Sequence, residues 1–346
     1  MSAIPEALLE IAAAFGARDG LHPRAALGSI DPFDRSDVLP LARPGRASCS
    51  GATHILRTSD GWIAATLARP ADWESVAAWL GDAALLDVAP DRQGWRRISE
   101  ATEQRPTRGL IAAATELGLA VAALGETRAT HPMPQVRRIG PRAQTPRRHL
   151  QVVDLSSLWA GPLCGAMLAA QGHEVIKLDP PERPDPTTAL PALDARLNGA
   201  KRRLASAFDL RPGSATHELI ASADVVISNA RPRVFSDSVL APERLAQRRP
   251  GLVWIAITAH GWRGRGAGRV GFGDDCAAAG GLVGRGREGA PRFLGDALAD
   301  PLTGMMAAVA ATRAIEAGGG VLVDAALARV AAGFAARLGL IAGRQP

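Results

Sequence analysis

Residues 150–179 read LQVVDLSSLWAGPLCGAMLAAQGHEVIKLD and contain two short apolar runs on either side of a segment rich in Ala and Gly. The first run, LQVVDL, and the last, EVIKLD, have the length and composition of buried strands. Gly161 and Pro162 place a tight turn at the start of the segment between them, because proline suits the first helical position. The stretch therefore predicts two parallel strands joined by a crossover helix.

The same pattern continues to about residue 260. Two further apolar runs, ADVVISN (223–229) and GLVWIAIT (251–258), flank a helical segment around PERLAQRR (242–249). Buried parallel strands joined by crossover helices produce such a pattern. The expected fold class of this half is α/β, with an open Rossmann-like parallel sheet.

The N-terminal half has a different pattern. Residues 53–81 hold two strand-like runs separated by a turn at Asp60 and followed by a helix. Helical segments at 95–105 and 107–117 come next, and the apolar run 119–124 follows them. This half predicts a second, smaller α+β domain.

These patterns divide the chain into four parts: 1–45, an N-terminal helix (4–15) and linker; 46–136, the small α+β domain; 137–149, an interdomain linker; and 150–346, the Rossmann-like domain. The interdomain linker is assigned from RRIGPRAQTPRR, whose Pro, Gly and arginine residues discourage burial. A solvated loop within one domain accounts for that composition equally well.

Composition argues against several classes of protein. The net charge is +6, but the arginines are dispersed, tyrosine is absent and aromatic residues make up only 4% of the chain, so no nucleic-acid partner is expected. No apolar run approaches the roughly 20 residues of a membrane span, and the cytoplasm is the expected compartment. Cys49, Cys164 and Cys276 lack the spacing of metal ligands or disulfides, and no metal is expected.

Basic residues lie near the predicted strands. Arg183 follows VIKLDPPE, Lys201 and Arg202 lie in LNGAKRRLASAFDL, and Arg231 lies in VVISNARPRVF. Open α/β sheets bind ligands at the carboxyl ends of their strands, so cations placed just after successive strands are expected to converge on phosphates. The free N–H groups of the helix start at Gly161 are a further candidate anion site.

A carboxylate stands at the start of the helix predicted in FLGDALADPLTGMMAAVAAT (293–312). Asp300 followed by Pro301 is a common helix start, and an N-cap of this type contributes roughly 1 kcal/mol of stability. The same position suits a nucleophile, since the helix dipole favours the ionised carboxylate. The spacing alone leaves both interpretations open.

Five segments, taken in order, resemble the family III CoA-transferases, the group that includes formyl-CoA transferase and the α-methylacyl-CoA racemases. They are VVDLSSLWAGPLCGAMLAAQGHEVIKLDPP, LNGAKRRLASAFDL, ADVVISNARPRVF, GFGDDCAAAGGLVG and ADPLTGMMAAVAATRAI. The resemblance covers residues 150 to about 330. Segments that resemble the small domain of the family precede this half, whereas in the family they follow it.

The resemblance implies an acyl-CoA:carboxylate CoA-transferase. In the family, the aspartate of a D-x-x-x-G-[ML] segment is the catalytic carboxylate, and Asp300 to Met305 match that segment. The implied chemistry is a covalent aspartyl intermediate, with coenzyme A bound as the substrate thioester, a carboxylic acid as acceptor, and a homodimer. The implied CoA-binding residues are Trp159, Ala160, Gly161, Arg183, Lys201, Arg202 and Arg231.

Two alternatives remain. The first is an acyl-CoA racemase or isomerase. The resemblance implies that the racemase branch of the family uses a His of a G-H-D segment together with the Asp as an acid/base pair. Here Phe272 stands at the His position and Gly273 at the position of the following acid. His260 or the neighbouring Asp274 and Asp275 would have to substitute. The other alternative is a catalytically silent subunit that binds CoA or a partner chain.

Overall fold

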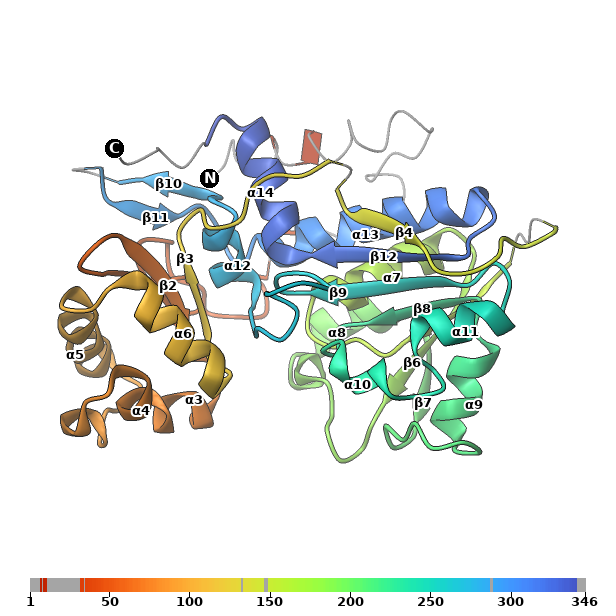
Figure 1. Ribbon diagram of the computed structural model, residues 1–346, viewed down its shortest axis with the longest axis horizontal. Helices are drawn as coiled ribbons and strands as arrows, with labels where there is room; N and C mark the ends of the chain where they lie inside the picture. The colour runs from red at the N-terminus through yellow and green to blue at the C-terminus, as the bar shows by residue number, and fades with distance from the viewer. Residues whose placement is uncertain are drawn as a thin grey trace. The chain divides into compact units, whose positions relative to one another are not determined.

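The computed structural model describes residues 7, 9–10, 32–33, 35–131, 133–145, 149–286 and 289–340. The chain divides into two compact units, each assembled from separate segments (Figure 1). The larger unit takes Met1–Leu39, His131–Ala267 and Asp300–Ala326, and the smaller takes Pro40–Thr130, Gly268–Ala299 and Leu327–Pro346. The segment predicted as one domain, 150–346, thus contributes to both units, and the predicted helix 4–15 falls largely outside the described residues.

The larger unit contains a seven-stranded sheet in the order β4-β12-β9-β8-β5-β6-β7. Six strands run parallel: β5 (Gln151–Asp154), β6 (Glu174–Asp179), β7 (Arg202–Ala205), β8 (Val225–Ser228), β9 (Val253–Thr258) and β12 (Val321–Ala326). From β5, the chain first builds outward through β6 and β7, and then returns to build on the other side through β8, β9 and β12. The predicted open Rossmann-like α/β sheet is confirmed.

The remaining strand, β4 (Gln135–Arg138), lies at the edge and pairs antiparallel with β12, with Val136 opposite Val323. The arginine-rich sequence suggested that a linker begins at residue 137. The structure instead uses its first residues as an edge strand whose side chains are mostly exposed. Charged side chains are common on edge strands, where they discourage pairing with another chain.

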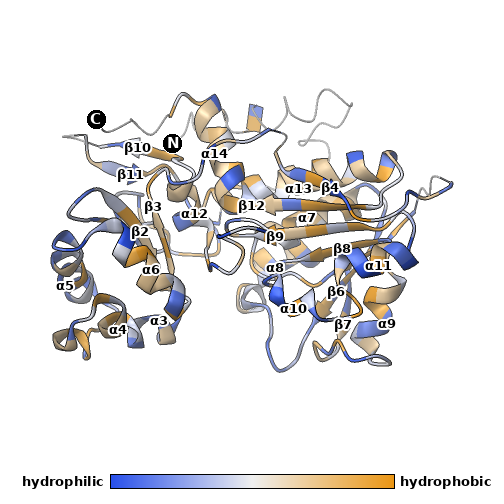
Figure 2. Cartoon of the chain, viewed as in Figure 1, coloured by the Kyte–Doolittle hydropathy of each residue, from blue (hydrophilic) through white to orange (hydrophobic). Residues whose placement is uncertain are grey.

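Helices cover both faces of this sheet. On one face lie α9 (Ala215–Ser222), α10 (Arg233–Ser236) and α11 (Pro242–Arg248), toward the viewer in Figure 1. Their Ile220, Phe235 and Leu245 pack in one buried cluster with Val153 and Trp254 of the strands. Figure 2 shows that the central strands of the sheet are hydrophobic and that many of the loops around them are hydrophilic.

On the other face, α7 (Ala160–Ala170) packs against β5, β6 and β8, and also against α8 (Pro191–Asn198) and α13 (Ala299–Glu316). The helix α7 is buried through most of its length, which explains its Ala- and Gly-rich sequence. None of the described helices has both the length and the apolarity needed to cross a lipid bilayer.

The smaller unit contains an antiparallel sheet of β1 (Thr53–Arg57), β2 (Trp62–Thr66) and β3 (Ala120–Ala123). The predicted hairpin is confirmed, and its turn has a second role. Asp60 accepts a hydrogen bond of 2.8 Å from the backbone N–H of Thr107, the first residue of α6 (Thr107–Leu117).

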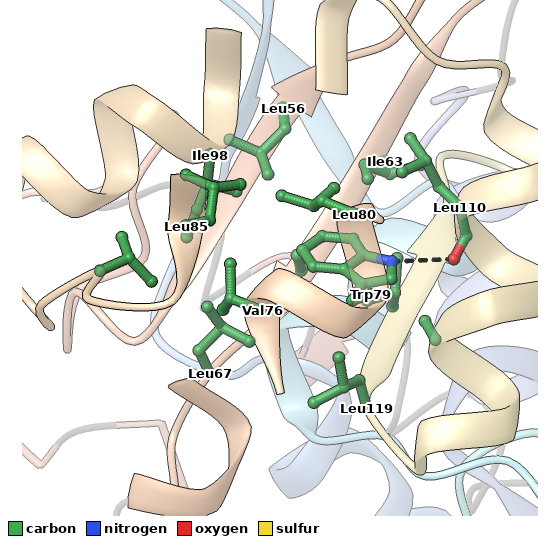
Figure 3. Packing of buried hydrophobic residues seen from close by; sticks show 14 of the residues in the cluster. Leu56, Ile63, Leu67, Val76, Trp79, Leu80, Leu85, Ile98, Leu110 and Leu119 are labelled. Carbon is green, nitrogen blue, oxygen red and sulfur yellow. Dashed lines mark hydrogen bonds between the residues drawn. The ribbon is translucent and has the colours of Figure 1, made fainter. Parts of the chain in front are cut away.

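One face of this sheet packs against α4 (Val76–Leu80), α5 (Arg92–Glu103) and α6 (Figure 3). There the buried Trp79 donates its Nε1–H to the carbonyl oxygen of Leu110 at 2.9 Å. Ile55 and Ala64 belong to a second cluster, with Ala278 of α12 (Gly273–Ala279). The remaining described elements of this unit are α3 (Pro70–Glu74), α14 (Leu327–Arg337), β10 (Val283–Arg285), β11 (Pro291–Phe293) and the 3₁₀ turn η1 (Ala83–Leu85). A second 3₁₀ turn, η2 (Pro186–Ala189), belongs to the larger unit.

Candidate active site

The connectivity of the larger sheet reverses direction between β5 and β8, which are neighbours although β6 and β7 separate them in sequence. Open α/β sheets bind ligands at such a switch point, beyond the carboxyl ends of the strands. The loops after β5 and β8 meet there. Asn229 donates its Nδ2–H to the carbonyl oxygen of Ser157 at 3.0 Å and so joins the two loops.

The turn after β5 is closely packed against the start of α7. Asp154 at the end of β5 accepts hydrogen bonds from both the backbone N–H (3.0 Å) and the hydroxyl of Ser156. A Cβ on Gly161 would lie only 2.1 Å from the Ser156 Oγ, so no larger residue fits at that position. The glycine seen in the sequence is therefore required by this contact.

Asp154 forms a fully buried ion pair with Lys201. The Lys201 Nζ donates to Asp154 Oδ2 at 2.7 Å, to Pro162 O at 2.8 Å and to Asn198 Oδ1 at 2.8 Å. Burial pushes the pKa of Asp154 upward, but the ammonium groups of Lys201 and Lys177 outweigh it and hold the pKa below its ordinary value.

Asp300 lies at the start of α13, beside the start of α7. The helix begins at Ala299, so Asp300 is its second residue and not the expected N-cap, and its side chain is half-buried. One turn later, a Cβ on Gly304 would lie 2.6 Å from Ala160 O and 3.1 Å from Leu163 Cβ. Residues four apart share a helix face, so this glycine contact places the Asp300 turn next to the first turn of α7.

Trp159, Ala160 and Gly161 form the entry to α7, and all three are buried. The indole of Trp159 is covered by the guanidinium of Arg35, whose Cζ lies 4.1 Å from the ring centroid. Such a cation–π contact is attractive, because the face of the ring carries partial negative charge. The structure thus brings these three residues together with the Asp300 turn.

The predicted basic residues divide into two groups. Arg183 and Arg231 are exposed in the loops after β6 and β8, at the carboxyl edge of the sheet. Lys201 and Arg202 do not follow a strand: β7 begins at Arg202, so both lie at its amino end, which corrects their expected placement. Lys201 is buried against Asp154, and Arg202 forms an exposed ion pair with Glu174 at 3.3 Å. The strand RRLA was missed because it is short and lacks an apolar run.

The structure adds Asp154, Lys177, Asp185 and Asn229 to the residues that organise this edge of the sheet. One signal for part of this set was visible in the sequence. Lys177 and Lys201 are the only lysines in a chain otherwise rich in arginine, and both prove to be buried and paired with aspartates.

The acids next to Phe272 serve the smaller unit. Asp275 is fully buried in the first turn of α12, where it accepts hydrogen bonds from Phe272 N–H at 2.8 Å and Thr66 Oγ at 2.9 Å. Burial raises the pKa of Asp275 to about 6. Asp274 accepts a bond of 2.9 Å from Ala297 N–H. Both carboxylates are therefore used as structural acceptors.

The smaller unit also carries a hollow of about 620 Å³. It is lined by Gly61 and Trp62 of the hairpin, by Leu124 after β3, and by Arg285 at the end of β10. The predicted site residues all belong to the larger unit.

Comparison with known proteins gives consistent names. A succinyl-CoA–D-citramalate CoA-transferase of Chloroflexus aurantiacus is 31% identical over 206 residues, which are 53% of this chain and 49% of the relative. A succinate–glutarate CoA-transferase of Agrobacterium fabrum is 30% identical over 230 residues, 60% of this chain and 58% of the relative. A crystal structure of a CAIB/BAIF family protein from Brucella suis aligns at 30% identity and a TM-score of 0.48, over 57% of this chain and 58% of that one.

The chain spans about half the length of the curated relatives that it matches. The model of one family, described as CoA-transferase family III, matches residues 148–341, which include β5 to β12, the switch point and Asp300. By this match over more than half of its length, the chain belongs to CoA-transferase family III.

Proposed function

We propose that the protein is an acyl-CoA:carboxylate CoA-transferase in which Asp300 is the nucleophile. The observation that carries the proposal is the position of Asp300 in the first turn of α13, one turn before the contact of Gly304 with Ala160 O. From this contact we infer that the Asp300 carboxylate lies beside the entry to α7. Membership of the family supports the same assignment.

The proposed reaction proceeds by covalent catalysis. The Asp300 carboxylate attacks the thioester carbonyl of the acyl-CoA, which forms an acyl–aspartyl anhydride and releases the CoA thiolate. The thiolate attacks the aspartyl carbonyl of this anhydride, and the donor acid leaves as its carboxylate. The acceptor carboxylate then attacks the resulting aspartyl-CoA thioester, which forms a second anhydride and releases the CoA thiolate. The thiolate finally attacks the acceptor carbonyl of this anhydride, which gives the new acyl-CoA and regenerates the Asp300 carboxylate.

The surroundings of Asp300 suit this role. Unpaired N–H groups at the N-terminus of a helix favour negative charge within the first turn, so the 18-residue helix α13 stabilises the ionised carboxylate. The small side chains of α7 and α13 let these two helices pack closely, with Gly304 against Ala160 O. Arg183 and Arg231, exposed at the carboxyl edge of the sheet, are the proposed partners of the CoA phosphates.

The proposed substrates are an acyl-CoA donor and a carboxylic acid acceptor. Relatives are named for succinyl-CoA, succinate, glutarate, citramalate and malate. We therefore propose short dicarboxylic and hydroxydicarboxylic acids as the first compounds to test. A homodimer is the proposed assembly, to be checked by sedimentation of the purified protein.

Peptide-mapping mass spectrometry after incubation with succinyl-CoA and a panel of other acyl-CoA thioesters tests the proposal. We expect a CoA or acyl mass on the wild-type peptide that contains Asp300 and none in Asp300→Ala. Glu316→Gln is the matched control, because Glu316 is an exposed acid at the opposite end of the same helix. Measurable CoA binding without any adduct would reject the covalent mechanism and leave Asp300 as a proton-transfer or helix-start residue.

A further inference from the structure

The turn between β5 and α7 contains a residue in an unusual backbone conformation. Leu158 has a φ of 71°, in the left-handed region that residues with a branched side chain rarely adopt. Its side chain is also one of the exposed large hydrophobic groups, at 37% exposure. Conformations of this kind persist only where the surrounding structure holds them, and they are concentrated at functional sites.

Two successive peptide groups of this turn are held by three side chains: Lys177 of β6, Asn229 from the loop after β8, and Asp185 at the start of η2. The Lys177 Nζ donates to the carbonyl oxygen of Ser156, and the Asn229 Nδ2 donates to that of Ser157 at 3.0 Å. The N–H of that same Ser157–Leu158 peptide group donates to Asp185 Oδ1 at 3.1 Å. The strained residue is therefore tied directly to Asp185.

The side chain of Asp185 is itself held in place by several contacts. Its side chain and that of Lys177 are each only 2% exposed, and Asp185 Oδ2 lies 3.1 Å from the Lys177 Nζ. The same Oδ1 that receives the Leu158 N–H also accepts from Thr187 N–H at 3.1 Å, at the start of η2. Lys177 Nζ also lies 4.0 Å from Asp179 Oδ1. Displacing the buried Asp185 carboxylate would break its contacts with Lys177, Leu158 and Thr187 together, which favours a fixed position for this side chain.

We propose that Asp185 is a positioning residue of the active site. Through the Leu158 N–H directly, and through Lys177 to Ser156 O, it holds the Leu158–Trp159 turn in the conformation that receives acyl-CoA. The exposed Leu158 side chain then presents an apolar surface to the pantetheine and acyl parts of the thioester. This inference rests on the proposed function and adds a residue that makes no contact with the reacting atoms.

Hydrogen exchange tests the structural half of the inference without any need for activity. We expect residues 156–159 to exchange at least tenfold faster in Asp185→Ala than in wild type. Asp185→Asn, which keeps an acceptor for the Leu158 N–H, is expected to fall between the two. Phe235→Leu, a change in the buried cluster on the opposite face of the sheet, is the control for general loss of stability. Equal exchange of this turn in Asp185→Ala and Phe235→Leu overturns the inference.

Kinetics and binding test the functional half. With the active fraction counted from the amount of covalent adduct, we expect Asp185→Ala to lower kcat by about 100-fold, because small displacements of a positioned group are costly in rate. Phe235→Leu is expected to retain kcat per active molecule. An unchanged kcat in Asp185→Ala, measured in this way, overturns the inference and leaves the transferase function standing.

Two further experiments distinguish failure of this inference from misfolding of the variants and from failure of the proposed function. If the Asp185 variants do not fold, Asn229→Ala removes the neighbouring bond to Ser157 O and is expected to change exchange and kcat in the same direction, by a smaller factor. If wild type forms no adduct, the proposed function fails, and isothermal titration with CoA decides the inference. At least tenfold weaker CoA binding by Asp185→Ala supports it, and equal binding, or none to wild type, overturns it.

Discussion

Replacing Lys201 by methionine tests whether the buried ion pair organises the larger unit. The Lys201 ammonium meets Asp154, Pro162 O and Asn198 within 2.8 Å, and its side chain and that of Asp154 are both 0% exposed. Removing one partner of such a pair leaves an uncompensated charge in the interior, which destabilises proteins by about 3–5 kcal/mol. Methionine keeps the length and apolar volume of the side chain, so packing changes little.

The adjacent Arg202→Met is a matched control. Arg202 pairs with Glu174 at 3.3 Å, but both side chains are more than half exposed, at 56% and 60%. Exposed pairs contribute about 0–1 kcal/mol. Urea unfolding followed by circular dichroism should therefore separate two neighbouring substitutions by at least about 2 kcal/mol at pH 7.

The pH dependence adds a second check on the same variant. The pKa of Asp154 lies below its ordinary value in the folded protein, so its stabilising contribution is complete above the unfolded pKa of about 4 and is lost as the pH falls through the folded pKa. The difference in unfolding free energy between wild type and Lys201→Met should therefore shrink as the pH falls. The reasoning is refuted if Lys201→Met costs no more than Arg202→Met, or if the difference does not depend on pH below 4.

Three further predictions concern other sites. Gly304→Ala should lower the free energy of unfolding by at least about 2 kcal/mol and abolish adduct formation, because the added Cβ would overlap the backbone of α7. The control is Gly109→Ala in α6, where a Cβ has space, and this change should stabilise the protein by up to about 1 kcal/mol. Equal effects of the two substitutions in thermal unfolding would contradict the close helix contact. Burial raises the pKa of Asp275 to about 6, so the folded protein binds this proton more tightly than the unfolded chain and loses about 2 kcal/mol of stability as the pH rises from 4 to 6. Asp275→Asn should flatten that slope in denaturation curves, and an unchanged slope would assign it to another group. Arg231→Ala should weaken CoA binding by about tenfold or more in calorimetry and affect pantetheine much less, since a charge-assisted bond to phosphate is lost; an equal loss for both ligands would remove Arg231 from the phosphate site.

Much of the fold follows from local sequence. The runs at 150–179 and 223–258 predict parallel strands and crossover helices, because the signals for buried strands and for helix starts come from residues close together in the sequence. The turn at Asp60 predicts the hairpin in the same way. The sequence also identified Asp300 and Gly161 as candidates, because Pro301 and Pro162 mark helix starts beside them.

Only the tertiary structure decided which distant segments meet. Composition assigned residues 137–149 to a linker, although Arg137 and Arg138 form an edge strand whose partner, β12, lies about 180 residues later. Spacing likewise placed Lys201 and Arg202 together as phosphate ligands, whereas the fold buries one ammonium against Asp154 and leaves the adjacent guanidinium in solvent. The sequence by itself determined the strands, helices and hairpin named above, because the apolar pattern of each one lies within a short stretch of residues. The pairing of charges, the strained turn at Leu158 and the close contact of Gly304 with α7 depend on long-range packing, which no local sequence pattern encodes.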